Sequence, residues 1–254
     1  MRFLFLLPVL CSTCLYAEAH LRAIPGLVAE STHVIGGRTK FPDPDFAKNI
    51  VLLKPSWCTG VVVEGCVITA AHCLVGSPIR VYSGPSPKES DPSVEISTIR
   101  SLGSGTTGAD LAVLKPSEPL PQGKGFSREV LPRSPLDLPH GSAVNIAGYG
   151  YEGTTFGVGG MENFGLGTRR IGESYFYGYR DMNGEKAGKE TVFLLRTSRN
   201  AQVGQIAAGG DSGGPVFVNG KIYGIAHAAL YPGTVAKTKS GGARADAGFG
   251  ATYS

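Results

Sequence analysis

The chain has 254 residues, of which 42% are hydrophobic, so it can bury one sizeable core or two small ones and disorder is excluded. Its 37 glycines and 17 prolines, against 17% charged residues, favour an all-β chain of short strands and tight turns. The net charge of +4 is scattered along the chain, so nothing indicates a nucleic-acid partner.

The first residues have the pattern of a secretory signal peptide. Arg2 precedes an apolar run at residues 3–10, and small residues follow at Ala17 and Ala19. We expect cleavage after Ala19, with residues 1–19 as the signal; the alternative is a buried apolar strand. The run is too short to span a bilayer, so we expect a secreted protein, extracellular or periplasmic, with no membrane association.

Five cysteines are present, and two of them, Cys11 and Cys14, fall inside the predicted signal. Neither follows the small residues that would favour a lipid anchor. The mature chain keeps Cys58, Cys66 and Cys73, and this odd number is met most simply by one disulfide and one free thiol. Their spacing matches no zinc-binding pattern that uses all three, so no metal is expected.

Short β-branched stretches separated by turn signals follow residue 50. The predicted strands are residues 50–53, 60–63, 67–69, 79–82, 94–99, 111–114, 143–147, 191–196, 215–218 and 222–226. Such regular short strands without helical periodicity indicate a barrel or a sandwich.

Two segments interrupt this pattern. The proline-rich residues 114–140 are predicted to form an extended linker between two halves. Residues 148–172 are dense in glycine without periodicity, and they are predicted to form a surface loop.

Three segments carry residue types suited to nucleophilic catalysis. The run GDSGGP at residues 210–215 places Ser212 on a glycine-permissive turn, where backbone N–H groups also converge. The run TAAHC ends a predicted strand and supplies His72, whose imidazole takes up a proton near neutral pH. The run ADLAVL places Asp110 directly before an apolar strand, where a carboxylate can be buried against an imidazole.

Each residue alone has an ordinary explanation. A single histidine after a strand is usually a core or surface residue, and a single aspartate or serine in a glycine-rich turn usually serves the turn. Considered jointly, these ordinary explanations are rejected, because they require several independent motifs to occur in this order by accident.

The motifs VIGG at residues 34–37, TAAHC, ADLAVL and GDSGGP, in this order, resemble the trypsin/chymotrypsin family. The resemblance covers residues 34–254. It implies an all-β fold of two packed six-stranded antiparallel β-barrels, residues 34–135 and 136–254, with the active site in the cleft between them. Gly148, Tyr149 and Gly150 resemble the opening of the second barrel.

The family's catalytic roles carry over to matching residues. The resemblance implies that Ser212 attacks the scissile carbonyl, that His72 accepts and returns the proton, and that Asp110 fixes the imidazole tautomer. The N–H groups of Gly210 and Ser212 would form the oxyanion hole. The pairing of Cys58 with Cys73 is also implied, while Cys66 has no family partner and is expected to be buried.

The resemblance further implies activation by proteolysis. Residues 20–33 would be a pro-segment, and the new N-terminus at Val34 would pair with Asp211 beside the nucleophile. His33 precedes the cut where trypsin-activated members carry Arg or Lys, so the activating protease is open. The alternative is that residues 34–37 are an ordinary strand and turn.

Specificity is predicted from departures from trypsin. Ile206 stands where trypsin has an acidic residue, so the substrate pocket is expected to be apolar. The predicted pocket residues are Ile206, Ala207, Gly209, His227 and Ala229. We therefore expect a preference for small or apolar side chains before the scissile bond.

The sequence thus predicts a secreted, monomeric serine endopeptidase that acts on polypeptides without a metal or organic cofactor. Two alternatives stay open. One is a non-catalytic binding protein on the same fold, favoured by the unusual activation site and the edge at residues 227–229. The other is an esterase that uses the same residues on other acyl groups.

Overall fold

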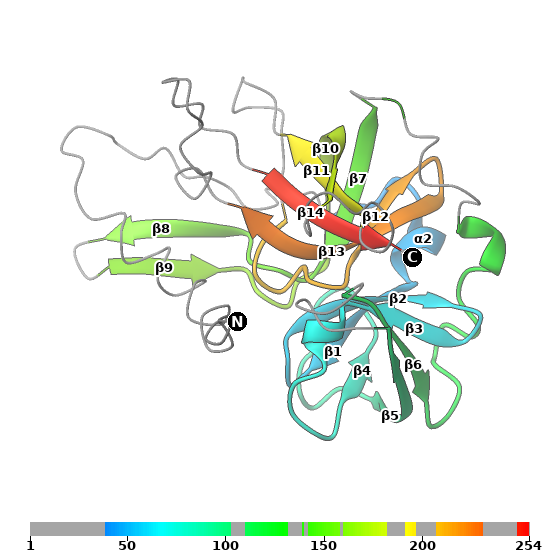
Figure 1. Ribbon diagram of the computed structural model, residues 1–254. Coiled ribbons are helices and arrows are strands. Elements are labelled where there is room, and N and C mark those ends of the chain that lie inside the picture. The colour runs from blue at the N-terminus through cyan, green and yellow to red at the C-terminus, as the bar shows by residue number, and fades with distance from the viewer. Residues whose placement is uncertain are drawn as a thin grey trace, which may run out of the picture. The chain divides into compact units, whose positions relative to one another are not determined.

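The structure is a computed structural model in which the described residues belong to one compact unit, residues 32–254 (Figure 1). It describes residues 39–102, 110–131, 139, 142–157, 160–181, 191–196, 207–230 and 248–253. The predicted signal peptide, the pro-segment and Val34 lie outside the described residues. Among the helices that the structure describes, none has the length and apolar character needed to cross a membrane.

The first barrel is closed and antiparallel, with the strand order β1-β2-β3-β6-β5-β4. Its strands are β1 (Ile50–Lys54), β2 (Cys58–Val63), β3 (Cys66–Thr69), β4 (Arg80–Tyr82), β5 (Ser93–Ser101) and β6 (Ala112–Pro116). A short helix α2 (Pro44–Ala47), capped by the Asp43 carboxylate, leads into β1. The 3-10 turns η1 (Ala71–Cys73) and η2 (Arg128–Val130) follow β3 and β6.

The second barrel is also closed and antiparallel, with the order β10-β11-β14-β13-β12-β7 (Figure 1). Its strands are β7 (Ala143–Gly148), β10 (Arg170–Asp181), β11 (Thr191–Arg196), β12 (Pro215–Val218), β13 (Lys221–Leu230) and β14 (Gly248–Tyr253). The predicted double-barrel fold is therefore confirmed. The proposed boundary between residues 135 and 136 lies outside the described residues and stays a prediction.

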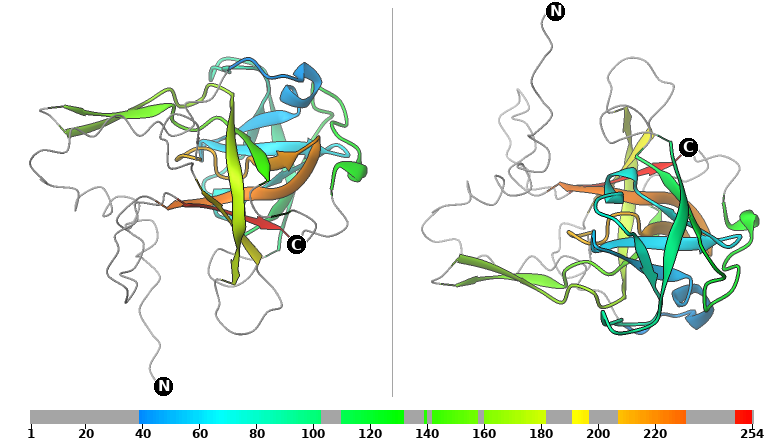
Figure 2. Two further views of the ribbon diagram at one scale, coloured as in Figure 1. Left: turned by 90° about the horizontal axis from the view of Figure 1, so that it is seen from above. Right: turned by 90° about the horizontal axis from the view of Figure 1, so that it is seen from below.

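The prediction of a surface loop at residues 148–172 was wrong for most of that segment. Strands β8 (Gly153–Gly157) and β9 (Gly160–Phe164) form a separate two-stranded sheet, visible as a hairpin in both views of Figure 2. β10 then begins at Arg170. The two strands of this hairpin are joined by backbone hydrogen bonds, which any sequence can form. The segment has no hydrophobic periodicity, so the sequence did not predict these strands.

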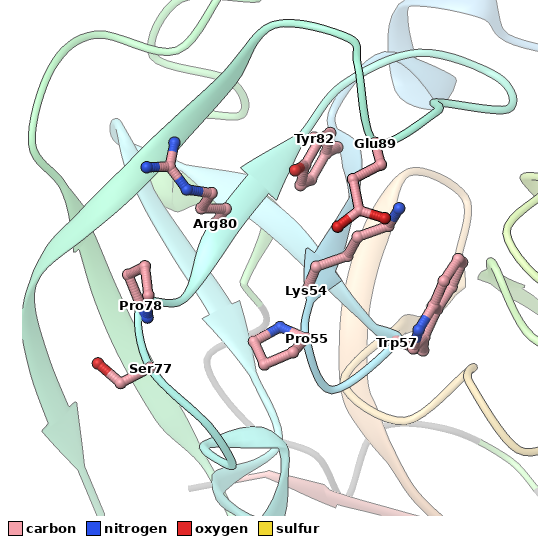
Figure 3. A pocket seen from close by; sticks show the side chains of 8 residues that line it. All are labelled: Lys54, Pro55, Trp57, Ser77, Pro78, Arg80, Tyr82 and Glu89. Carbon is pink, nitrogen blue, oxygen red and sulfur yellow. The ribbon is translucent and has the colours of Figure 1, made fainter.

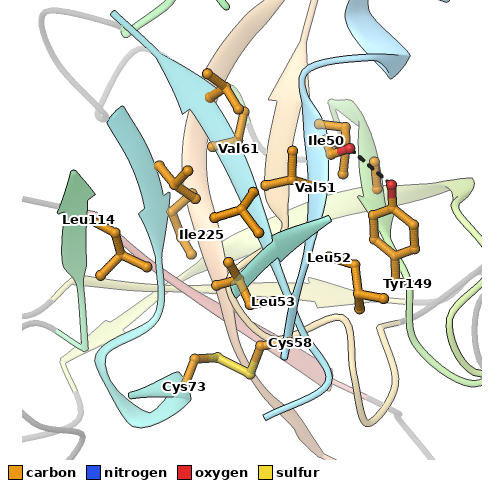
Figure 4. Close-up of a cluster of buried hydrophobic side chains, with 14 of the residues drawn as sticks. Ile50, Val51, Leu52, Leu53, Cys58, Val61, Cys73, Leu114, Tyr149 and Ile225 are labelled. Carbon is orange, nitrogen blue, oxygen red and sulfur yellow. Dashed lines mark hydrogen bonds between the residues drawn. A yellow bond between two sulfur atoms is a disulfide. The ribbon is translucent and has the colours of Figure 1, made fainter. Parts of the chain in front are cut away.

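The core runs continuously from the first barrel to the second. Every residue of β1 and β2 is buried, although a strand with one solvated face would alternate. The reason is that residues of the second barrel, including Tyr149 and Ile225, pack into the same apolar cluster (Figure 4). The buried Tyr149 hydroxyl also donates to the Ile50 carbonyl at 3.0 Å.

Candidate active site

A histidine and an aspartate meet where two paired strands end. β3 ends at Thr69 and pairs there with Ala112 of β6, so the residues just outside these positions are neighbours. His72 Nδ1 lies 2.5 Å from Asp110 Oδ2, and the His72 backbone N–H donates to Asp110 Oδ1 at 2.8 Å. Both carboxylate oxygens of Asp110 are thus directed at one residue.

Burial of the carboxylate determines what the imidazole can do. The Asp110 side chain is 1% exposed, whereas that of His72 is 38% exposed. An ionised carboxylate only accepts hydrogen bonds, so the His72 Nδ1–H donates and Nε2 is left as the proton acceptor. This is the tautomer that a general base requires.

Ser212 lies on a tight turn that glycines make possible. Gly210 and Gly213 have φ angles of +95° and +81°, which favour glycine. The Gly214 N–H closes the turn on the Asp211 carbonyl at 2.8 Å. A Cβ at Gly213 would overlap the Thr69 hydroxyl, so this position also requires the absence of a side chain.

Thr59 of β2 ties the serine turn to the first barrel. Its N–H donates to the Ser212 carbonyl at 2.8 Å, and its hydroxyl donates to the Gly210 carbonyl at 2.8 Å. The same hydroxyl accepts from the Tyr149 N–H at 3.0 Å, and the Thr59 carbonyl accepts from Thr69. Thr59 is fully buried, so these bonds are shielded from water. Sequence reasoning missed this residue, because a threonine in a strand carries no signal of such a role.

The disulfide brings the histidine and the serine turn to one place. Cys58 and Cys73 are bonded, with a sulfur–sulfur distance of 2.08 Å. Cys73 Sγ lies 3.6 Å from the Ser212 carbonyl oxygen, and a ring nitrogen of His72 lies within 4.8 Å of both sulfurs. Because both sulfurs are in the disulfide, neither offers a thiolate to a metal. Cys66 is half-buried and free, less buried than expected.

Two backbone donors of the serine turn have no acceptor among the described residues. Within the described part of the chain, the N–H groups of Gly210 and Ser212 form no hydrogen bond. Neighbouring N–H groups of the turn are paired: that of Gly213, for example, donates to the Ala226 carbonyl at 2.7 Å. Within the part of the chain that the structure describes, no acceptor therefore competes with an external oxygen atom for these two donors.

Asp211 is a buried carboxyl group directly before the serine. Its oxygens accept from the N–H groups of Gly150 and Ala208, each at 2.8 Å. Burial raises its pKa from 3.8 to about 7, although these two hydrogen bonds and the Arg170 charge oppose the rise. No ion pair joins Asp211 to any described lysine or arginine. Among the described residues, Arg170 lowers this pKa through its charge but forms no ion pair with Asp211.

The predicted pocket residues are described only in part. Ala207 is buried at 2% exposure and Gly209 is exposed. His227 and Ala229 lie on β13, but their side chains are outside the description, as is Ile206. The apolar pocket therefore stays a prediction.

Two closed six-stranded antiparallel barrels, with a histidine–aspartate pair on one and a glycine-rich serine turn on the other, define the chymotrypsin-like class of protein. A comparison with protein-family models matches the trypsin family over residues 35–244, and the chain belongs to that family. The resemblance drawn from the motifs is thereby confirmed, and in general class the chain is a serine protease. A comparison with curated proteins found no match.

Proposed function

We propose that this chain is a secreted serine endopeptidase that hydrolyses polypeptides through an acyl-enzyme, with His72, Asp110 and Ser212 as its catalytic triad. The observation that carries the proposal is the contact of 2.5 Å between the His72 ring and the buried Asp110 carboxylate. The disulfide that follows His72 contacts the Ser212 carbonyl, which supports a shared site.

In the proposed reaction the same groups act first in acylation of the serine and then in hydrolysis of the acyl-enzyme. Ser212 Oγ attacks the scissile carbonyl while His72 Nε2 takes its proton, and Asp110 stabilises the imidazolium that forms. The N–H groups of Gly210 and Ser212 hold the oxyanion, and loss of one such donor costs about 3 kcal/mol in a related mechanism. His72 then protonates the leaving amine, and water hydrolyses the acyl-enzyme by the same route in reverse.

Activation by cleavage before Val34 is part of the proposal. Its support is the buried Asp211 carboxyl, which has two backbone donors but no described cation as a partner. A new ammonium at Val34 would supply that charge beside the turn, and an activating protease is the implied partner. Breaking such a buried pair costs about 3–5 kcal/mol.

Secretion and an apolar substrate pocket are two further parts of the proposal. The disulfide between Cys58 and Cys73 suits an oxidising compartment. The small, buried side chains of Ala207 and Ala208 lie directly before the serine turn and favour small or apolar groups beside it.

The proposal is tested by N-terminal sequencing and cleavage profiling of secreted material. We expect active protein to begin at Val34 and to cleave after small or apolar residues, with no activity in Ser212→Ala. A preference for Arg or Lys would contradict the predicted pocket. A chain that begins at Val34 but hydrolyses no peptide would favour the non-catalytic binding protein.

A further inference from the structure

A hollow of about 280 Å³ opens on the first barrel, and neither His72 nor Ser212 is among the residues that line it (Figure 3). Its lining includes residues at the end of β1 and in β4, and the turns next to these strands. The charged and aromatic residues that line it are Lys54, Trp57, Arg80, Tyr82 and Glu89. None of them has a role in the proposed catalysis.

Lys54 is the unusual member of this lining. The residue is 8% exposed, and its ammonium lies 4.3 Å from the centroid of the Trp57 ring and 5.0 Å from that of Tyr82. The two rings attract the charge through their faces. Yet among the described residues the ammonium has no hydrogen-bond acceptor and no ion-pair partner. The ammonium is not one of the buried side-chain atoms that lack a partner, so its three N–H donors need acceptors and can reach an anion that enters the hollow.

The other charges around the hollow do not meet this need. Arg80 is paired with Glu95 at 3.2 Å, so its own charge is matched. Glu89 is exposed and lines the same hollow, but it forms no ion pair with Lys54. The hollow therefore holds an ammonium that forms no ion pair with a described residue, and Glu89 is the acidic side chain of its lining (Figure 3).

The hollow is separated from the serine turn by one residue, Trp57. The indole lines the hollow, while the Trp57 carbonyl oxygen lies 3.2 Å from the place that a Cβ on Gly210 would occupy. Trp57 also directly precedes Cys58 of the disulfide. The hollow thus lies close enough to the serine turn for a side chain of an extended peptide bound at Ser212 to enter it.

We propose that this hollow binds the carboxylate of an Asp or Glu side chain of the polypeptide substrate, through the Lys54 ammonium. The identity of the ligand as a substrate rests on the proposed function. The charge complementarity rests on Lys54 and its surroundings alone. A hydrogen bond between two charged groups in such a site raises affinity by about 10-fold or more.

Trp57 provides a direct readout, because it is the single tryptophan of the chain. The full chain carrying Ser212→Ala is titrated with short peptides in which one Glu is moved along an apolar sequence, and with the same peptides carrying Gln. We expect one Glu position to change Trp57 fluorescence and to bind at least about 10-fold more tightly than its Gln counterpart. Catalysis is not needed, so a chain without peptidase activity can still pass this test.

Variants separate Lys54 from general charge effects. Lys54→Met keeps the aliphatic stem and is expected to lose the preference for Glu, whereas Lys54→Arg keeps it. Lys88→Met removes an exposed charge from the turn beside Glu89, and it should leave the preference unchanged. Glu89→Gln removes from the lining a charge of the same sign as the ligand, so Glu peptides should bind a few-fold more tightly, without any change to the buried residues.

Equal binding of the Glu and Gln peptides at every position would overturn the proposal. So would unchanged Trp57 fluorescence with all peptides, or a preference for Glu that survives Lys54→Met. If Lys54→Met does not fold, a lack of any effect of Glu89→Gln on the affinity for Glu peptides would overturn it instead.

Discussion

At the scale of single residues, the contact between Asp110 and His72 fixes which ring nitrogen of the imidazole faces the carboxylate. Asn in place of Asp110 would offer either an amide N–H or a carbonyl to Nδ1, so the imidazole would no longer be held in one tautomer. We expect Asp110→Asn to lower kcat by about 10⁴-fold, the effect of this change in the chymotrypsin-type template. The measurement is peptide hydrolysis with matched unfolding curves. A kcat within a few-fold of wild type would argue against this role.

A second prediction at the scale of residues concerns the hydroxyl of Thr59. Thr59→Val keeps the shape of the side chain but leaves the Gly210 carbonyl and the Tyr149 N–H without their partner in a buried site. We expect a loss of about 1–3 kcal/mol in the free energy of unfolding for each unsatisfied group, together with slower labelling of Ser212 by active-site probes.

Thr59→Ser is the matched control, because it retains the hydroxyl. It should keep most of the rate at which Ser212 reacts. If active-site probes labelled Ser212 at the same rate in Thr59→Val and in Thr59→Ser, the hydrogen bonds of the Thr59 hydroxyl would not position the serine turn.

At the scale of elements, the serine turn and the turn between β12 and β13 offer a matched pair of glycines. Gly213 and Gly220 have φ angles of +81° and +75°, so alanine is strained at both by about 1–2 kcal/mol. A Cβ at Gly220 meets nothing within 4 Å, whereas one at Gly213 would overlap Thr69 and Thr59.

We therefore expect Gly213→Ala to lose clearly more stability than Gly220→Ala, and to lose reactivity at Ser212 as well. Urea unfolding and probe labelling measure the two effects. Equal losses of stability in the two variants would mean that the close approach of β2 and β3 to the turn does not matter.

Several strands of the two barrels could be predicted from the sequence. The β-branched runs predicted strands close to β1, β7, β11 and β12, because burial selects such residues wherever a strand packs. The β8–β9 hairpin was missed, since glycine-rich strands pair through the backbone and leave no pattern in their side chains.

For the site, the motifs predicted His72, Asp110 and the serine turn, and the resemblance predicted the disulfide. The roles of Thr59 and Lys54 depend on which groups fold against them from distant parts of the chain. A threonine in a strand and a lysine at its end look ordinary until those neighbours are known.

At the scale of the whole molecule, Asp211 couples protonation to the stability of the uncut chain. Its pKa rises from 3.8 to about 7 on folding, so the folded state holds the extra proton between these values. The stability that this proton brings is complete below pH 3.8 and is lost as the pH rises through 7. The shift corresponds to about 4 kcal/mol.

We expect the free energy of unfolding of the full chain to fall between pH 4 and pH 7, and to fall less in Asp211→Asn. The slope with pH is compared rather than the absolute value, because Asn also changes the hydrogen bonds to Ala208 and Gly150. Asp45→Asn, at an exposed carboxylate, is the control and should leave the slope unchanged. Identical slopes for Asp211→Asn and the wild type would contradict this assignment.

The central claim is that Ser212 is a nucleophile activated by His72. Its most direct test is covalent labelling of the secreted, cut protein with a fluorophosphonate probe, followed by mass spectrometry of the labelled peptide. The account predicts a single adduct on Ser212, which disappears in Ser212→Ala and forms far more slowly in His72→Ala. An unlabelled Ser212 in protein that begins at Val34, or an adduct on a different residue, would contradict it.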